Sequence, residues 1–145
     1  MDEAIAKLPD ADAFRAQTTL DAVRRELKAR GGDAFLNARL LLSSLGRRLA
    51  SGRAPPSEEI VVGVLDVLCD FSKCMDAELL AGVAPIIADA VPLLSKEKPR
   101  RAAKNVIAAL TKRLPSAAAR ISDAIVTKGL RSENVRRGRT RHAPV

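Results

Sequence analysis

The chain is poor in the side chains that most often build strands and active sites. Of its 145 residues, three are Phe, one is His, and none is Trp or Tyr. Strands are enriched in aromatic and β-branched residues, so the low aromatic content argues against an all-β fold. The single histidine, His142, lies among arginines near the C-terminal end, where we expect no shielded partner to position it as a general base.

Motifs for catalysis are also lacking. The sequence contains no phosphate-binding glycine loop, no paired-histidine metal motif and no Gly-x-Ser-x-Gly motif. Asp66 and Asp70 are one helical turn apart, but carboxylates in such a pair are usually solvated on the surface. We therefore expect no enzymatic activity, no cofactor and no small-molecule substrate.

Cysteine is scarce, with Cys69 and Cys74 as the complete set. Two thiols without a neighbouring histidine do not complete a structural zinc site. Five residues apart on one helix, they would point about 140° from each other, which disfavours a disulfide. We expect a metal-free protein in which Cys69 is a small core residue.

Long hydrophobic runs are missing as well. The most apolar stretch, 79–94, is interrupted by Pro85, Asp89 and Pro92 and is too short to span a bilayer comfortably. The first twelve residues include four acidic side chains, which a transit peptide would avoid. We expect no membrane span and no targeting segment within this numbering.

What the chain does contain favours helix, because Ala, Leu, Arg and Lys are abundant. Six helices are expected, with Thr18 or Thr19 capping the first and Gly31-Gly32 ending it. The first, second, fifth and sixth helices are expected to cover about 19–30, 33–50, 98–114 and 116–129. The third is expected to begin at Ser57 and the fourth after Asp76. Pro85 should kink the fourth helix.

Short connectors predict an all-α fold of antiparallel helical hairpins. Shifting the sequence by 42 places aligns apolar positions of 64–83 with those of 106–125, a period in the range of two-helix repeats. This favours a short α-solenoid, with a compact helical bundle as the alternative. The expected organisation is a weakly structured segment over 1–17, a helical-repeat domain over 18–130 and a flexible basic tail over 131–145.

Apolar spacing also predicts the core. Residues three and four apart form the buried stripe of the third helix, and a wide apolar surface makes the fourth helix central. The predicted stripe consists of Val61, Val64, Leu65, Leu68 and Phe71. Within this core, Leu68 and Ile87 are expected to be the positions most sensitive to truncation.

Charge is distributed very unevenly along the chain. Residues 54–95 carry one basic and seven acidic side chains, whereas residues 96–145 carry fourteen basic and three acidic ones, a net charge of +11. A cationic segment of this kind attracts phosphate-rich or acidic partners. The candidate polyanion-binding residues are Arg100, Arg101, Lys104, Lys112, Arg120, Lys128, Arg131, Arg136, Arg137, Arg139 and Arg141.

The segment LCDFSKCMDAELLAGVAPII, residues 68–87, resembles the helix–turn–helix units of heptatricopeptide and octotricopeptide repeats, which accompany RAP domains. The resemblance lies in an apolar helix ending at Phe71-Ser72-Lys73, a short turn, and Asp76-Ala77-Glu78-Leu79-Leu80 opening the next helix. HEAT and armadillo repeats are the competing resemblance. The first family implies an RNA-associated scaffold, often organellar.

Two functions follow as hypotheses. The first is a non-catalytic helical-repeat scaffold that docks on RNA through the basic C-terminal third, for example as a structural subunit of an organellar ribosome. Its partners would be RNA, bound through the backbone, and neighbouring proteins, in an intracellular and mitochondrial or other organellar setting. The alternative is a HEAT- or armadillo-type module that binds an acidic protein partner.

Overall fold

All secondary structure in the described part of the chain is helical. The computed structural model describes residues 2–31, 37–50, 56–116, 119 and 123. The elements are α1 (Asp2–Lys7), the 3-10 helix η1 (Leu8–Asp10), α2 (Ala13–Arg30), α3 (Ala38–Ala50), α4 (Glu58–Cys74), α5 (Ala77–Leu80), α6 (Val83–Ala90), the 3-10 helix η3 (Val91–Leu93) and α7 (Glu97–Arg113). The expectation of an all-α chain is confirmed for these residues.

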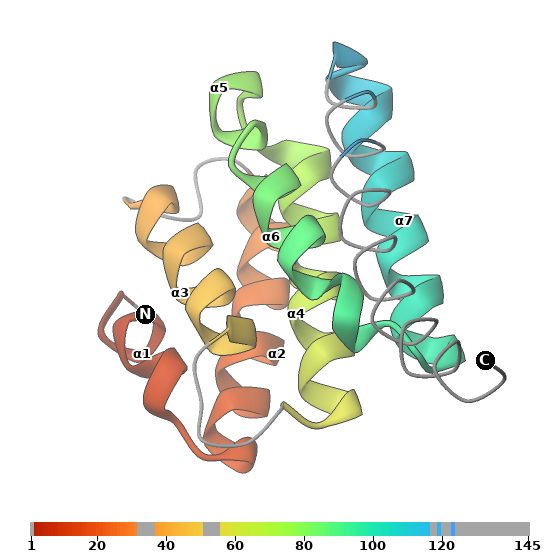
Figure 1. The fold of residues 1–145 in the computed structure, drawn as a ribbon. Coiled ribbons are helices and arrows are strands. Elements are labelled where there is room, and N and C mark those ends of the chain that lie inside the picture. Colours follow the sequence, from red (N-terminus) through yellow and green to blue (C-terminus); the bar gives the residue numbers. More distant parts are fainter. Residues whose placement is uncertain (1, 32–36, 51–55, 117–118, 120–122, 124–145) are drawn as a thin grey trace, which may run out of the picture.

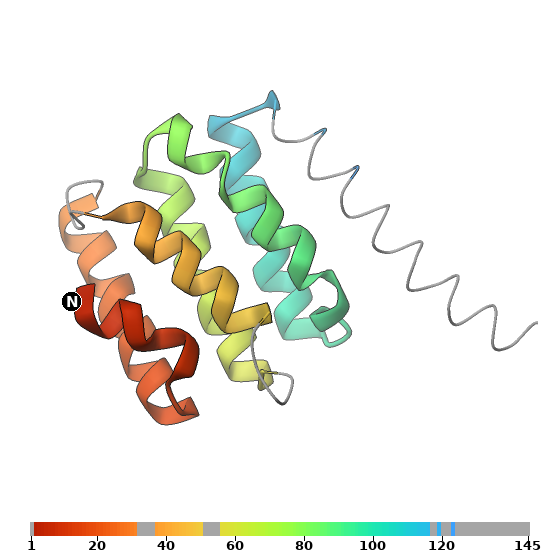
Figure 2. The same ribbon diagram turned by 60° about the vertical axis from the view of Figure 1, so that its left-hand side comes forward.

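The helices form two layers. In one layer α3 packs between α1 and α6, and in the other α4 packs between α2 and α7 (Figures 1 and 2). Successive longer helices lie in alternate layers. The most extensive contacts therefore join helices of the same layer that do not follow each other directly in the sequence, namely α4 with α7 and α2 with α4. Consecutive helices face each other across the core between the layers.

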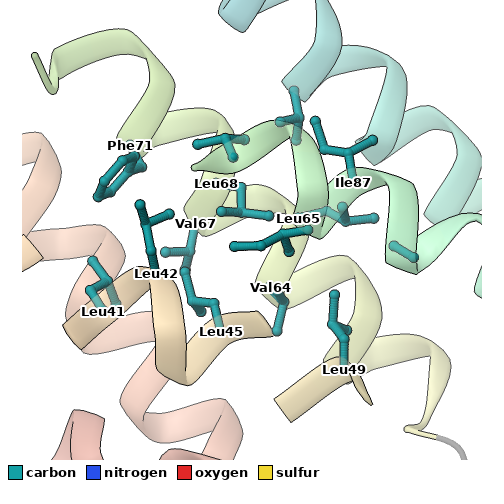
Figure 3. Packing of buried hydrophobic residues seen from close by; sticks show 14 of the residues in the cluster. Leu41, Leu42, Leu45, Leu49, Val64, Leu65, Val67, Leu68, Phe71 and Ile87 are labelled. Carbon is teal, nitrogen blue, oxygen red and sulfur yellow. The ribbon is translucent and has the colours of Figure 1, made fainter. Parts of the chain in front are cut away.

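Helix α4 is the centre of this core. The predicted stripe on α4 is fully buried, and Ile60 and Val67 extend it. Figure 3 shows Leu42 and Leu45 of α3 and Ile87 of α6 beside the α4 side chains Leu65, Leu68 and Phe71. The predicted burial of Leu68 and Ile87, which have no exposed surface, is confirmed. The expectation that the fourth predicted helix is central is wrong, because α4, the third predicted helix, makes the most extensive contacts.

Helix α2 begins earlier than predicted. The Asp12 side chain accepts a hydrogen bond from the Arg15 backbone N–H at 2.8 Å, which makes Asp12 the N-cap. The predicted cap at Thr18 or Thr19 is wrong, because the Thr18 hydroxyl donates to the Phe14 carbonyl inside the helix. Gly31, with φ of 61°, ends α2 as predicted, since that backbone conformation favours glycine.

Pro85 acts differently from the prediction. Instead of one kinked helix, residues 77–90 form two helices separated by a turn at Ala81-Gly82. In a continuous helix the Pro85 ring would clash with the Ala81 carbonyl, and Pro85 has no N–H to donate to it. The break places Pro85 in the first turn of α6, where a missing N–H costs no helical hydrogen bond.

The N-terminal segment also differs from the expectation of weak structure over 1–17. Ile5 of α1 and Leu8 of η1 have at most 1% of their surface exposed, and both belong to the common core. Burial of these two side chains anchors α1 and η1 to α3. The start of the predicted helix 33–50, most of the predicted helix 116–129 and the predicted tail 131–145 lie outside the described residues.

Candidate polyanion interface

Helix α7 separates its apolar and basic residues onto different faces. Its buried face consists of small or apolar residues packed on α4, including Ala102, Ala103, Val106 and Leu110. Two alanines on this face let the helix backbones approach closely. The helical repeat of 3.6 residues then places the charged positions outside. The exposed residues of the predicted site on this helix are Arg100, Arg101, Lys104 and Lys112.

This exposed face carries little opposing charge. Glu97 is the only acidic residue of α7, and it pairs with Arg101 at 2.8 Å. Both side chains are at least 70% exposed, so this pair adds little stability and leaves Arg101 able to exchange partners. Among the residues the structure describes, Arg100, Lys104 and Lys112 make no ion pair. The face is therefore cationic and open to solvent.

The structure brings together four of the eleven predicted site residues. The other seven, which were predicted to extend the cationic surface, lie outside the described residues. They are Arg120, Lys128, Arg131, Arg136, Arg137, Arg139 and Arg141.

Arg113 has a structural contact that sequence reasoning did not identify. Its guanidinium donates to the backbone carbonyls of Ser72 and Met75, at the end of α4. These carbonyls are among the terminal acceptors that a helix cannot satisfy by itself. The helical position of Arg113 could have indicated this contact. Successive residues of a helix are about 100° apart, so Arg113 points away from Lys112 and toward α4. Arg113 thus ties α7 to α4 and is not part of the open cationic face.

A shallow groove of about 390 Å³ runs beside this face, between α4 and α7. Lys73 of α4 and Lys112 of α7 both line the groove, together with Asn105. Neither lysine makes an ion pair within the described part of the chain. The groove therefore extends the cationic surface from α7 onto the neighbouring helix.

Arg24 of α2 neutralises the carboxylates in the same groove. It lies 3.6 Å from Asp66 and 3.0 Å from Asp70, and it donates a hydrogen bond to Asp70. The prediction that Asp66 and Asp70 are solvated is wrong, since both are half-buried and paired. Burial raises the pKa of Asp66, and the nearby Arg24 guanidinium counteracts part of this rise.

The raised pKa of Asp66 predicts a pH-dependent contribution to stability. A carboxyl whose pKa is higher in the folded state binds its proton more tightly there than in the unfolded chain. We therefore expect the free energy of unfolding of the wild type minus that of Asp66→Asn to decrease as pH rises through and above the ordinary aspartate pKa. Urea denaturation of both proteins at about pH 3.5 and about pH 7 measures this difference. A difference that stays constant, or that grows with pH, would contradict the assignment.

Both cysteines are free and half-buried on α4. Burial raises the pKa of each thiol, which disfavours the reactive thiolate. Cys69 donates to the Asn105 carbonyl and Cys74, the last residue of α4, donates to the Asp70 carbonyl. Cys69 was expected to be a core residue and is instead half-buried at the edge of the core.

Within the described ranges, no three His, Cys, Asp or Glu side chains come together as potential metal ligands. No helix in the described part of the chain combines the length and apolarity needed to cross a bilayer.

Comparisons of the chain with protein-family models, curated proteins and solved structures found no match.

Proposed function

We propose that this protein is a non-catalytic helical scaffold that docks on RNA through its basic C-terminal third. The observation that supports this best is the outer face of α7, where four basic side chains are exposed and a single acidic residue opposes them. Positive side chains arranged along one face neutralise successive phosphates and release condensed counterions. Backbone contacts of this kind give affinity without reading the sequence.

The low aromatic content supports backbone contact over base recognition. Proteins that bind single strands use aromatic rings as stacking platforms, and this chain has three Phe and no Trp or Tyr. Phe71 is completely buried in the core, and Phe14, although exposed, belongs to α2, at the other end of the described fold from α7 (Figure 2). The proposed role is therefore that of a structural subunit in a ribonucleoprotein, such as an organellar ribosome, with other faces in contact with neighbouring proteins.

The arrangement of helices supports a scaffold role. A chain that alternates between two layers while its helices add side by side is typical of helical-hairpin stacks. We therefore propose a short α-solenoid over a closed bundle, in line with the resemblance to hairpin repeats. Such stacks present extended surfaces, which suits simultaneous contact with RNA and with proteins.

Filter binding of the full chain to two unrelated RNAs at two salt concentrations tests the proposal. We expect similar affinities for both RNAs and a steep fall in affinity with salt, because counterion release dominates backbone binding. Weak binding that is insensitive to salt would contradict RNA docking. Crosslinking in cells separates the alternatives, since recovery of acidic protein partners without RNA would instead support a HEAT- or armadillo-type interaction module.

A further inference from the structure

Phe14 lies in the first turn of α2 and is 81% exposed. It is the one large hydrophobic side chain with such exposure in the part of the chain that the structure describes. An isolated exposed apolar residue needs no explanation, but an exposed ring beside an apolar hollow indicates an interaction site.

Such a hollow adjoins Phe14. A groove of about 520 Å³ runs between α1 with η1 and the start of α2, and its described lining residues fall within 4–19. Ala4, Ala6 and Ala11 supply small apolar walls, and Phe14 stands at the same groove. Alanine walls leave space that a larger apolar side chain from another molecule can fill.

The same surface carries charges of both signs. Lys7 and Arg15 line the groove together with Asp10. Lys7 pairs with Glu3 at 3.1 Å and Arg15 approaches Asp12 at 3.8 Å, whereas Asp10 makes no ion pair with a described residue. Because charges of both signs lie on one surface, Asp10 of one copy can pair with Lys7 or Arg15 of a second copy.

We propose that this surface is a self-association site, at which two copies of the chain pair through their α1–α2 grooves. A two-fold interface joins the same patch on both subunits, so the patch must contain both the projecting group and its receptor. Here Phe14 is the projecting group and the alanine-walled groove is the receptor. Since the surface carries charges of both signs, the acidic group of one copy can pair with a basic group of the other. The proposal does not depend on RNA binding.

The position of the groove leaves the cationic face free in the dimer. Helices α1 and α2 lie at one end of the described fold, and α7 lies toward the other (Figure 2). Two copies paired at this end would carry their α7 faces on the outside. An interface built on one groove is expected to be smaller than the roughly 800 Å² per partner of a standard interface, so we expect a dimer with a dissociation constant in the micromolar range.

Sedimentation equilibrium of the full chain from about 5 to 500 µM tests the proposal, because this range brackets micromolar dissociation constants. The wild type should approach twice the monomer mass at the upper end. Phe14→Ser, which removes the projecting ring, and Ala6→Glu, which fills the groove with charge, should each remain monomeric. Both residues are exposed, so circular dichroism should show unchanged helix content.

The matched control is Ala29→Glu, which adds the same charge at an exposed alanine at the opposite end of α2. This variant should dimerise like the wild type. A wild type that stays monomeric across the whole range would overturn the proposal, as would dimers that persist in both groove variants. Equal dissociation by Ala29→Glu would also overturn it, because the effect would then follow net charge and not the groove.

Discussion

Replacing Arg100, Arg101 and Lys104 with alanine should weaken RNA binding similarly for unrelated sequences. These three side chains are exposed on one face of α7, where each can neutralise a phosphate. Each lost phosphate contact lowers the slope of log affinity against log salt by about one, so the triple variant should lose about three. Filter binding at several salt concentrations measures the slope directly.

The control for this variant is the triple substitution of Arg25, Arg39 and Arg47 with alanine. It removes the same net charge from exposed positions on α2 and α3. If RNA binds along the exposed face of α7, the slope of log affinity against log salt should be close to the wild-type value for this control. Equal loss in both triple variants would show that binding depends on net charge and not on α7, and an unchanged slope in the α7 variant would exclude the proposed interface.

Leu68→Ala should lower the free energy of unfolding by about 2–5 kcal/mol. Leu68 has no exposed surface and lies on α4, which packs against α2 and α7 in its own layer and against α3 and α6 across the core. The surrounding helices cannot close fully over the vacated volume, so a cavity term adds to the lost burial. Urea denaturation measures the change, and a marginally stable domain of this size would feel it strongly.

Two companion variants sharpen this test. Ile87→Ala should have a comparable cost, because Ile87 is buried on α6 across the core from α4. Val62→Ala, at a half-buried position of α4, should cost clearly less. A cost below about 0.5 kcal/mol at both Leu68 and Ile87 would contradict the assigned core, since full burial of such side chains is worth more.

Helix content and the core of α4 were predictable because they depend on local periodicity. Val64, Leu65 and Leu68 recur at spacings that one helix face imposes, whatever the helix packs against. Ser57, whose hydroxyl accepts from the Ile60 N–H at 3.3 Å, was likewise recognisable as a cap from its position alone. The exposure of Arg100, Arg101 and Lys104 followed from the same rule, once the buried face of α7 was known.

Other features were not predictable from neighbouring residues. Ile5 and Leu8 lie in a short segment without helical periodicity, and they are ordered because α3 provides the apolar surface that covers them. Arg24 and Asp70 are 46 positions apart, and nothing in the sequence near either residue indicates the other. The contact of Arg113 with the end of α4 joins residues 41 and 38 positions apart, so it too depends on the tertiary structure.

The sequence by itself determined the all-helical class, the apolar faces of α4 and α7 and the segregation of positive charge toward the C-terminal third. Each depends on composition or on a spacing of a few residues. The tertiary structure alone decided the two layers, the Arg24 pairing and the groove beside Phe14. These features form at contacts between elements that are distant in sequence or separated by a turn. Which helices become neighbours depends on how all the apolar faces are buried together.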